Sequence, residues 1–224
     1  MIAVFLQVRL DSTRLPGKAL LPILGKPMVR VVMDALRNIS ADLYVLVTDR
    51  EGKEHLESLA EEAGFQTFEG PKLDVLSRFC QAVEKYRPTT VVRATGDNPL
   101  VSWELANQIL CEHLELEADY SAYQGMPIGF GVEVVQAEAL LKAQGVSEDP
   151  YDHEHVTPYL YRHPELFYLH QPLVSPRFRG RARVTVDTRE DYEHILSLFR
   201  RIPGNIPPPL DVLMRLLQEH KEEV

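Results

Sequence analysis

The sequence predicts an α/β protein with a mainly parallel sheet, built as a single domain. Short apolar runs rich in β-branched residues alternate with longer amphipathic stretches through residues 1–100. This alternation is typical of right-handed β-α-β crossovers, which place successive strands parallel to one another. The chain has 224 residues, of which 45% are hydrophobic and 25% charged, so it is long and apolar enough to bury one substantial core.

The first half of the chain contains the regular part of the pattern. Helices are expected at about 27–38 and 53–63, the second ended by Gly64, and a third has Leu73, Leu76, Cys80 and Val83 on one face. Apolar runs typical of strands alternate with these helices, at residues 2–8, 43–47, 65–68 and 90–94.

The second half, from about residue 120 to 224, is less regular. One or two strands are expected within 120–135, where three glycines interrupt the run, and a late strand is expected at 183–186. Thr188 and Asp191 have the spacing of a capping box that begins a helix. The remaining expected elements are helices at 102–115, 189–200 and 209–221, the last two separated by a proline-rich elbow at 203–209.

Composition excludes several classes of protein. The net charge is −9, from 24 basic and 33 acidic residues, which argues against a nucleic-acid-binding protein. The apolar N-terminal run is too short for a signal sequence or a membrane span, so we expect a cytoplasmic protein without a membrane partner. Cys80 and Cys111 lack the spacing of a metal site, and we expect two buried, reduced thiols.

The loop after the first expected strand has the most distinctive side chains. Arg9, Arg14 and Lys18 fall within ten residues, together with two hydroxyls and a flexible Gly17. Ligands of open α/β sheets bind beyond the carboxyl ends of the strands, which is where this loop is expected. Arginine forks and a mobile lysine suit a polyphosphate. The loop matches neither GxxxxGK[ST] nor GxGxxG, so the alternative on composition alone is a solvated basic loop.

Two acidic residues are candidate Mg²⁺ ligands. Asp97 follows the strand expected at 90–94, and Asp187 ends the strand expected at 183–186. Mg²⁺ in proteins is bound through one or two carboxylates together with phosphate oxygens and water. The alternative is that Asp97 only caps a turn and Asp187 only precedes a helix, since both lie in segments with strong turn or capping residues.

Two further polar segments are less specific. The glycines before Glu133 would let the backbone approach a sugar, and the Glu133 carboxylate would accept hydrogen bonds from the sugar hydroxyls. The alternative is that these glycines mark bulges, as glycines in strands more often do. His153 and His155 flank Glu154 in an expected helix, where positions i and i+2 point to different faces. A zinc site at these histidines is therefore disfavoured, because a third ligand is also missing.

These segments resemble a known family. The run Gln7-x-Arg9-x-x-Ser12-Thr13-Arg14-Leu15-Pro16-Gly17-Lys18 resembles the signature of the sugar-acid cytidylyltransferases, which include the 3-deoxy-manno-octulosonate and acylneuraminate enzymes. The whole chain is similar to the spore coat polysaccharide biosynthesis protein F family within that group. The supporting segments occur in the family's order over nearly the full length: Asp74-Val75-Leu76-Ser77-Arg78-Phe79, Gly96-Asp97-Asn98-Pro99-Leu100, Gly131-Val132-Glu133-Val134, Glu154-His155-Val156-Thr157-Pro158-Tyr159 and Thr185-Val186-Asp187-Thr188.

The resemblance implies a nucleotide-diphospho-sugar transferase fold, a Rossmann-like three-layer α/β/α sandwich. It also implies Mg²⁺-dependent transfer of CMP from CTP to a sugar or sugar acid in surface polysaccharide biosynthesis, with release of pyrophosphate, by a homodimer. In such an enzyme the elaborated second half, about 120–224, would bind the acceptor and form the dimer interface. Such chemistry depends on positioning and charge stabilisation rather than on a covalent nucleophile. The resemblance implies that the triphosphate is bound by Arg9, Ser12, Arg14 and Lys18, and the rest of the nucleotide by Gln7, Arg78 and Thr95. It implies that the metal is bound by Asp97 and Asp187, and the acceptor by Glu133, Glu154 and His155. The catalytic residues would be Arg9, Lys18 and Asp97.

Two positions depart from the family pattern. Asp11 stands where many relatives have a small residue, and it would bind a metal, contact a base or weaken triphosphate binding. His153 stands where relatives commonly have arginine, so a neutral or amino sugar is an alternative to an acidic acceptor. Two other functions stay open: a glycosyltransferase that uses a nucleotide-sugar donor, and a non-catalytic nucleotide-binding subunit.

Overall fold

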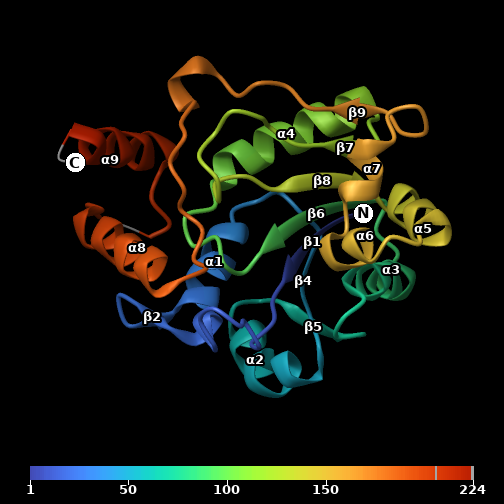
Figure 1. The fold of residues 1–224 in the computed structure, drawn as a ribbon, viewed down its shortest axis with the longest axis horizontal. Coiled ribbons are helices and arrows are strands. Elements are labelled where there is room, and N and C mark those ends of the chain that lie inside the picture. Colours follow the sequence, from blue (N-terminus) through green and yellow to red (C-terminus); the bar gives the residue numbers. More distant parts are fainter. Residues whose placement is uncertain (205, 223–224) are drawn as a thin grey trace.

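The computed structural model describes residues 1–204 and 206–222, and within them a seven-stranded sheet has the order β5-β4-β1-β6-β8-β7-β9. Figure 1 shows this sheet crossing the centre of the molecule. The four strands expected from the first half are all present, and the region 120–135 contributes two short ones. The strands of this sheet are β1 (Ile2–Gln7), β4 (Leu43–Thr48), β5 (Gln66–Glu69), β6 (Thr90–Thr95), β7 (Tyr120–Ser121), β8 (Glu133–Gln136) and β9 (Leu169–His170).

All of these strands except β8 run in one direction. β1 lies at the centre and pairs in parallel with β4 on one side and with β6 on the other, with Gln7 opposite Val47 and Thr95. β8 is antiparallel to both β6 and β7, and Arg93 therefore lies opposite Glu133. The carboxyl ends of β1 and β6 meet at one edge of the sheet, together with the beginning of β8.

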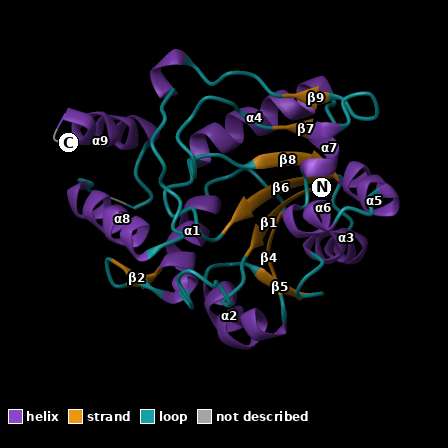
Figure 2. Cartoon of the chain, viewed as in Figure 1, coloured by secondary structure: helices purple, strands orange, loops and turns teal. Residues whose placement is uncertain are grey.

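Helices cover both faces of the sheet, as Figure 2 shows. One face packs against α1, α2, α4, α8 and α9, and the other packs against α3, α5 and α7. The expected helices are confirmed, with ends that differ by a few residues. Leu73, however, precedes α3 and is exposed, so its place on the apolar face of that helix was predicted wrongly. The helices are α1 (Met28–Leu36), α2 (Arg50–Glu62), α3 (Val75–Tyr86), α4 (Trp103–Leu116), α5 (Ala137–Val146), α6 (Pro150–His155), α7 (Pro158–Arg162), α8 (Arg189–Arg201) and α9 (Leu210–Glu222), with the short 3₁₀ turns η1 (Lys18–Leu20) and η2 (Pro176–Phe178).

Alternation along the strands produces two separate cores. In β1, Val4 and Leu6 face the first group of helices, whereas Ala3 and Phe5 face the second group. A small antiparallel ribbon of β2 (Pro22–Ile23) and β3 (Lys26–Pro27) lies between η1 and α1. This three-layer arrangement confirms the predicted mainly parallel α/β fold. The elbow expected at 203–209 includes residue 205, which lies outside the described residues.

The strand expected at 183–186 is absent from the described structure, so that prediction is wrong. This segment is extended, but only Arg183 forms a bridge, with Ile128. The backbone N–H of Val184 donates to the Ile128 carbonyl at 2.8 Å, and that of Val186 donates to the Asp97 carbonyl at 2.8 Å. The apolar pattern of the segment reflects burial against loops, because its hydrogen-bond partners do not belong to a strand.

The two cysteines differ in environment. Both are free, and Cys80 is buried as expected, with burial raising the pKa of its thiol to about 12. Cys111 is exposed, which corrects the expectation of two buried thiols. α4 buries Ile109, Leu110 and His113, so Cys111 falls on the opposite face of the helix. Among the described residues, no helix is both long and apolar enough to cross a membrane.

The capping box expected at the start of α8 is confirmed. The Thr188 side chain accepts the backbone N–H of Asp191 at 3.2 Å, and the Asp191 carboxylate accepts the backbone N–H of Thr188 at 2.8 Å. The same carboxylate accepts the N–H of Asp187 at 2.9 Å. The cap therefore also fixes the residue that precedes the helix, which lies in the site described below.

His113 makes the stability of the fold depend on pH. Its ring is buried in α4, and this burial lowers its pKa to about 4. Between pH 4 and 6.5 the unfolded chain therefore binds more protons than the folded chain, so the free energy of unfolding increases as the pH rises through this range. The same contribution to stability is lost as the pH falls through it. We expect His113→Asn to reduce the slope of stability with pH, by at most about 1.4 kcal/mol per pH unit.

Urea unfolding measured between pH 4 and 7 tests this expectation. The matched control is His55→Asn, because His55 is exposed on α2. An unchanged slope in His113→Asn would show that other groups cause the acid sensitivity.

Candidate active site

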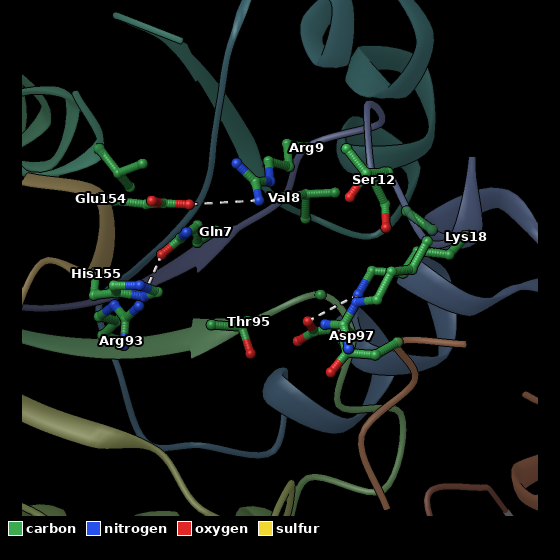
Figure 3. Close-up of a pocket in the computed structure, with 16 residues that line it drawn as sticks. Gln7, Val8, Arg9, Ser12, Lys18, Arg93, Thr95, Asp97, Glu154 and His155 are labelled. Atoms are coloured by element: carbon green, nitrogen blue, oxygen red, sulfur yellow. Dashed lines mark hydrogen bonds and ion pairs between the residues drawn. The ribbon is translucent and has the colours of Figure 1, made fainter. Parts of the chain in front are cut away.

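A cavity of about 350 Å³ lies at the carboxyl ends of β1 and β6 (Figure 3). One side carries Lys18 and Asp97, and the other carries Arg9 and Glu154 from the β1 loop and α6. Ten residues singled out from the sequence line this one cavity, although they come from four distant segments. They are Gln7, Arg9, Ser12, Arg14, Lys18, Thr95, Asp97, Glu154, His155 and Asp187.

The β1 loop (residues 8–18) reaches the cavity because it turns back on itself. The backbone N–H of Gly17 donates to the Leu10 carbonyl at 3.0 Å, and Gly17 has φ of 67°. A residue with a side chain would be strained in this left-handed conformation. The turn places Lys18 at the start of η1 with its side chain directed into the cavity.

The loop after β6 approaches β1 closely. The N–H of Gly96 donates to the Gln7 carbonyl at 2.9 Å, and a Cβ at Gly96 would come within 2.7 Å of the Val8 side chain. Glycine is therefore required for the loop to lie against β1. The next residue, Asp97, is in consequence held opposite the end of the β1 loop.

The ammonium group of Lys18 joins the two candidate metal ligands. Lys18 Nζ donates to Asp97 Oδ2 at 3.1 Å, to Asp187 Oδ1 at 3.0 Å and to the Val186 carbonyl at 2.7 Å. Three acceptors match the three N–H bonds of the ammonium group. The two carboxylates thus face a single position, which the ammonium group of Lys18 occupies.

Asp187 contacts three positively charged side chains of the site. Besides Lys18, Arg14 contacts Asp187 Oδ1 at 3.1 Å, and Arg183 forms a hydrogen bond with Asp187 Oδ2. Burial alone would raise the pKa of Asp187, but the hydrogen bond from Lys18 and the three positive charges outweigh it and lower that pKa. The carboxylate therefore stays ionised well into the acid range.

Asp97 does not cap the helix that follows it, and Asp187, although it precedes α8, does not cap that helix. Ser102 caps α4, and Thr188 caps α8, in each case through a side-chain oxygen. The side chains of Asp97 and Asp187 are directed instead at Lys18. The turns therefore position these two residues, and their carboxylates are not used as helix caps.

Arg93 is a site residue to which the sequence assigned no role. It lies in β6 and donates to Gln7 Oε1 at 3.0 Å and to Glu133 Oε2. Glu133 Oε1 also accepts from the Tyr120 hydroxyl at 2.7 Å and from Thr157 Oγ1 at 2.8 Å. A basic residue inside an otherwise apolar buried strand was the available signal, because such a charge must have a partner.

A second cavity, of about 430 Å³, adjoins the first. Arg93 and Thr95 line both cavities, and Glu133 lines the second. The loop from Gly125 to Val132 forms the rest of its wall. Gly129 has φ of 100°, and a Cβ there would approach the backbone N of Thr185 to 2.9 Å. The absence of a side chain at Gly129 therefore lets the backbone at Thr185 pack closely against this loop.

The residues of α6 divide between the cavity and the protein interior. Glu154 and His155 line the first cavity, and Glu154 lies 3.7 Å from Arg9. His153 points elsewhere, with Nδ1 2.9 Å from Asp74 and Nε2 2.9 Å from the Ser147 carbonyl, contacts that raise its pKa. The two histidines thus face apart, and the described residues contain no cluster of three metal-binding side chains.

Arg78 and Asp11 lie beside the cavity. Arg78 is completely buried and does not line the first cavity, although Val75, one helical turn earlier in α3, does. Asp11 forms an ion pair with Lys72 at 2.9 Å, and the hydrogen bond from Lys72 lowers the pKa of Asp11. This ion pair connects the β1 loop to the loop before α3.

Comparison with known proteins identifies the family. A family model described as cytidylyltransferase matches residues 3–221. This chain belongs to the cytidylyltransferase family. The enzyme is 34% identical over 209 residues to the spore coat polysaccharide biosynthesis protein SpsF of Bacillus subtilis (strain 168), covering 89% of this chain and 87% of the relative. The resemblance inferred from the sequence is therefore confirmed, and the enzyme is a nucleotidyltransferase.

Solved structures confirm the Rossmann-like nucleotidyltransferase fold. A cytidylyltransferase from Leptospira borgpetersenii has a TM-score of 0.91 at 24% identity, covering 99% of this chain and 95% of that one. A CMP:2-keto-3-deoxy-manno-octonic acid synthetase complexed with CTP has a TM-score of 0.71 at 14% identity, covering 89% and 98%. Rv0371C of Mycobacterium tuberculosis, in a complex with manganese, has a TM-score of 0.60 at 17% identity, covering 88% and 97%.

The charge pairing predicts how Asp187 responds to loss of Lys18. We expect Lys18→Met to raise the pKa of Asp187, because Lys18 supplies both a hydrogen bond and a positive charge that lower it. Carbon-detected NMR titration of the aspartate carboxyls measures this shift. Lys85→Met, on the far end of α3, is the control and should leave Asp187 unchanged, and an unshifted Asp187 in Lys18→Met would show that Arg14 and Arg183 suffice.

Proposed function

We propose that this enzyme transfers CMP from CTP to a sugar acceptor of surface polysaccharide synthesis, with Mg²⁺ as cofactor and pyrophosphate as the second product. The observation that carries the proposal is the Lys18 ammonium group held between Asp97 and Asp187 at the end of a cationic loop. Two comparisons support the substrates. The relative in Bacillus subtilis is named for spore coat polysaccharide biosynthesis, and the synthetase neighbour is complexed with CTP.

The triphosphate would lie along the β1 loop. Arg9 and Arg14 have side chains 48% and 62% exposed, and the Ser12 hydroxyl lines the same cavity. Each arginine is paired with a carboxylate in the structure, Arg9 with Glu154 and Arg14 with Asp187. Phosphate oxygens would replace these carboxylates as partners of the guanidinium groups, since arginine binds phosphate through two parallel N–H bonds.

The residues at the strand ends fit a divalent cation. Lys18 Nζ shows that both carboxylates can approach one positive charge within 3.1 Å. Mg²⁺ prefers one or two carboxylates together with phosphate oxygens, which is the donor set that Asp97, Asp187 and a triphosphate would provide. When bound, the ion would neutralise charge on the phosphate oxygens. The manganese complex of the structural neighbour Rv0371C supports a divalent metal.

The transfer requires the acceptor hydroxyl to attack the α-phosphorus. The new bond joins the acceptor oxygen to phosphorus, and the bond from the α-phosphorus to the oxygen of pyrophosphate breaks. Lys18, Arg9 and Arg14 would stabilise the charge that develops on the phosphate oxygens, because fixed charges act strongly in a cavity that excludes most water. No residue is required to form a covalent intermediate.

The acceptor would enter the second cavity, which shares the wall of Arg93 and Thr95 with the first. Glu154 and His155 line the first cavity near this wall and would contact the acceptor. The oxygens of Glu133 already accept from Arg93, Tyr120 and Thr157. Glu133 would therefore act mainly by positioning Arg93 beside the acceptor. A homodimer and a cytoplasmic location stay predictions.

Thermal unfolding with CTP, UTP, ATP and GTP, each with and without Mg²⁺, tests nucleotide use directly. Ligand at a hundredfold excess over its Kd should add about 2.7 kcal/mol to stability. We expect a shift selective for CTP and larger with Mg²⁺. Sugar transfer from a nucleotide-sugar donor without pyrophosphate release would instead identify a glycosyltransferase.

Lys18→Ala and Asp97→Asn should abolish most pyrophosphate release from CTP across a panel of sugar acceptors. Loss of one group that stabilises transition-state charge typically costs about 10²–10³-fold in rate. Lys26→Ala is the matched control, since Lys26 pairs with Asp34 outside the cavity. Near-normal release by both site variants, with circular dichroism confirming an intact fold, would contradict the proposal.

A further inference from the structure

The helix α6 carries two residues of the first cavity but is too short to hold its own position. Glu154 and His155, which line the cavity, lie in its last turn. The helix has six residues, and isolated helices shorter than about 12–15 residues are marginal in water. Contacts with neighbouring elements must therefore determine where these two side chains lie.

The C-terminal end of α6 is held in a strained turn. Val156 has φ of 75° and ψ of −54°, and the N–H of Thr157 donates to the His155 carbonyl at 3.0 Å. These angles and this hydrogen bond define a γ-turn, a strained conformation that persists only where the surrounding structure holds it. The Val156 side chain is completely buried, and the Thr157 hydroxyl donates to Glu133, so the core fixes this end of the helix.

His153 holds the rest of the helix through both nitrogens of its ring. Nδ1 lies 2.9 Å from Asp74 Oδ1, and Nε2 lies 2.9 Å from the Ser147 carbonyl oxygen. Asp74 is the N-cap of α3, where the same Oδ1 accepts the N–H of Ser77, and Ser147 is the C-cap of α5. His153 thus joins α6 to the start of α3 and to the end of α5.

These two contacts require the charged form of the His153 ring. A carboxylate and a carbonyl oxygen only accept hydrogen bonds, and a neutral imidazole has a single N–H to donate, whereas the imidazolium ion donates from both nitrogens. In agreement, the hydrogen bonds to Ser147 and Asp74 raise the pKa of His153. Loss of the proton leaves one of the two oxygens without a donor.

The charged groups around His153 favour the same form. Asp74 faces the ring from the loop before α3, and Asp149 and Asp152 act on it from the cap and the first turn of α6. Arg162 of α7 contacts both Asp149 and Asp152, so its positive charge is paired with them. Asp74 is therefore the carboxylate in direct contact with the ring.

We propose that His153 is a positioning residue, whose imidazolium form keeps Glu154 and His155 directed into the first cavity and whose deprotonation releases them. Its effect on turnover rests on the proposed function, in which these two residues contact the sugar acceptor. The proton is lost as the pH rises above 6.5, the ordinary pKa of histidine, so α6 is fixed on the acid side and loosens on the alkaline side.

Hydrogen exchange of the α6 amides, measured in the free protein between about pH 6 and 8.5, tests the inference. In the unmodified protein we expect the protection factors, which are corrected for the intrinsic effect of pH, to fall at least about fivefold over this range. In His153→Arg they should change less than about twofold, because arginine stays charged and offers several N–H donors. In His153→Asn they should be low throughout.

Asp74→Asn tests the charge without changing the histidine. Asparagine caps helices as aspartate does, so α3 keeps its cap while the charge facing His153 is removed. The pH at the midpoint of α6 loosening should therefore fall. An unmoved midpoint overturns the inference, even if His153→Arg fails to fold.

His163→Asn is the matched control. His163 is the C-cap of α7, and its Nδ1 lies 2.7 Å from Glu165, so this substitution also removes a histidine paired with a carboxylate, but away from the first cavity. Its α6 amides should respond to pH as in the unmodified protein. Protection that does not vary with pH in the unmodified protein, or that falls equally in a folded His153→Arg, overturns the inference and leaves the proposed function standing.

The consequence for turnover is measured with any sugar of the acceptor panel that supports pyrophosphate release from CTP. The KM for that sugar should rise from about pH 6 to 8.5 in the unmodified enzyme and stay within about twofold in His153→Arg, because only the unmodified ring loses its charge. A KM that rises equally in both enzymes overturns the inference. Absence of release with every sugar overturns the proposed function, and the exchange experiment still decides the role of His153.

Discussion

A single ammonium group holds the candidate active site together. Lys18 is 79 residues from Asp97 and 169 from Asp187, yet its three donors satisfy both carboxylates and the Val186 carbonyl. The segment before α8 forms no strand with the sheet. Its placement depends on Lys18, on the burial of Val184 and Val186, and on the hydrogen bonds from their N–H groups to the Ile128 and Asp97 carbonyls. The β1 loop, the β6 loop and the start of α8 therefore assemble as one unit.

The same principle extends to the other cations around the cavities. Arg9 pairs with Glu154, Arg93 with Glu133, and Lys72 with Asp11. Although the net charge of the protein is −9, these three cations lie around the cavities, and each is paired with a carboxylate. An anionic ligand must therefore compete with these carboxylates for the basic side chains. On binding it replaces the carboxylates as the partners of those side chains. Ions that offer one or two charges gain little from this exchange, whereas a polyphosphate engages several pairs at once.

Much of this organisation could be predicted from the sequence, and the failures have physical causes. The first half follows local rules, since each of its strands and helices is indicated by the residue pattern of its own segment. The segment 183–186 has the residue types of a strand, but its hydrogen bonds go to loops at Ile128 and Asp97, which no local pattern reveals. Cys111 follows the buried Leu110 on α4, and a one-residue step changes the face of the helix.

The site shows the same division between local and distant information. The β1 loop and the two aspartates were identified because their residue types and their places after expected strands indicate chemistry. Arg93 received no role from the sequence analysis, because its partners Gln7 and Glu133 come from strands separated by 86 and 40 residues. The burial of Arg78 was equally inaccessible, since a charged residue on a helix is normally solvent-exposed and its neighbour Gly70 belongs to a different element.

The reversed direction of β8 separates the two halves of the site. A parallel strand would bring its last residue to this edge, whereas β8 brings its first, so the loop that precedes it, residues 122–132, forms the wall of the second cavity. The strands β1, β4 and β6 lie within residues 1–100, and β1 pairs with β4 and β6 without any contribution from the loop 122–132. Changes in its length or composition leave β1, β4 and β6 in place. A lineage of such enzymes can therefore diversify on one side of the sheet while the other is inherited unaltered.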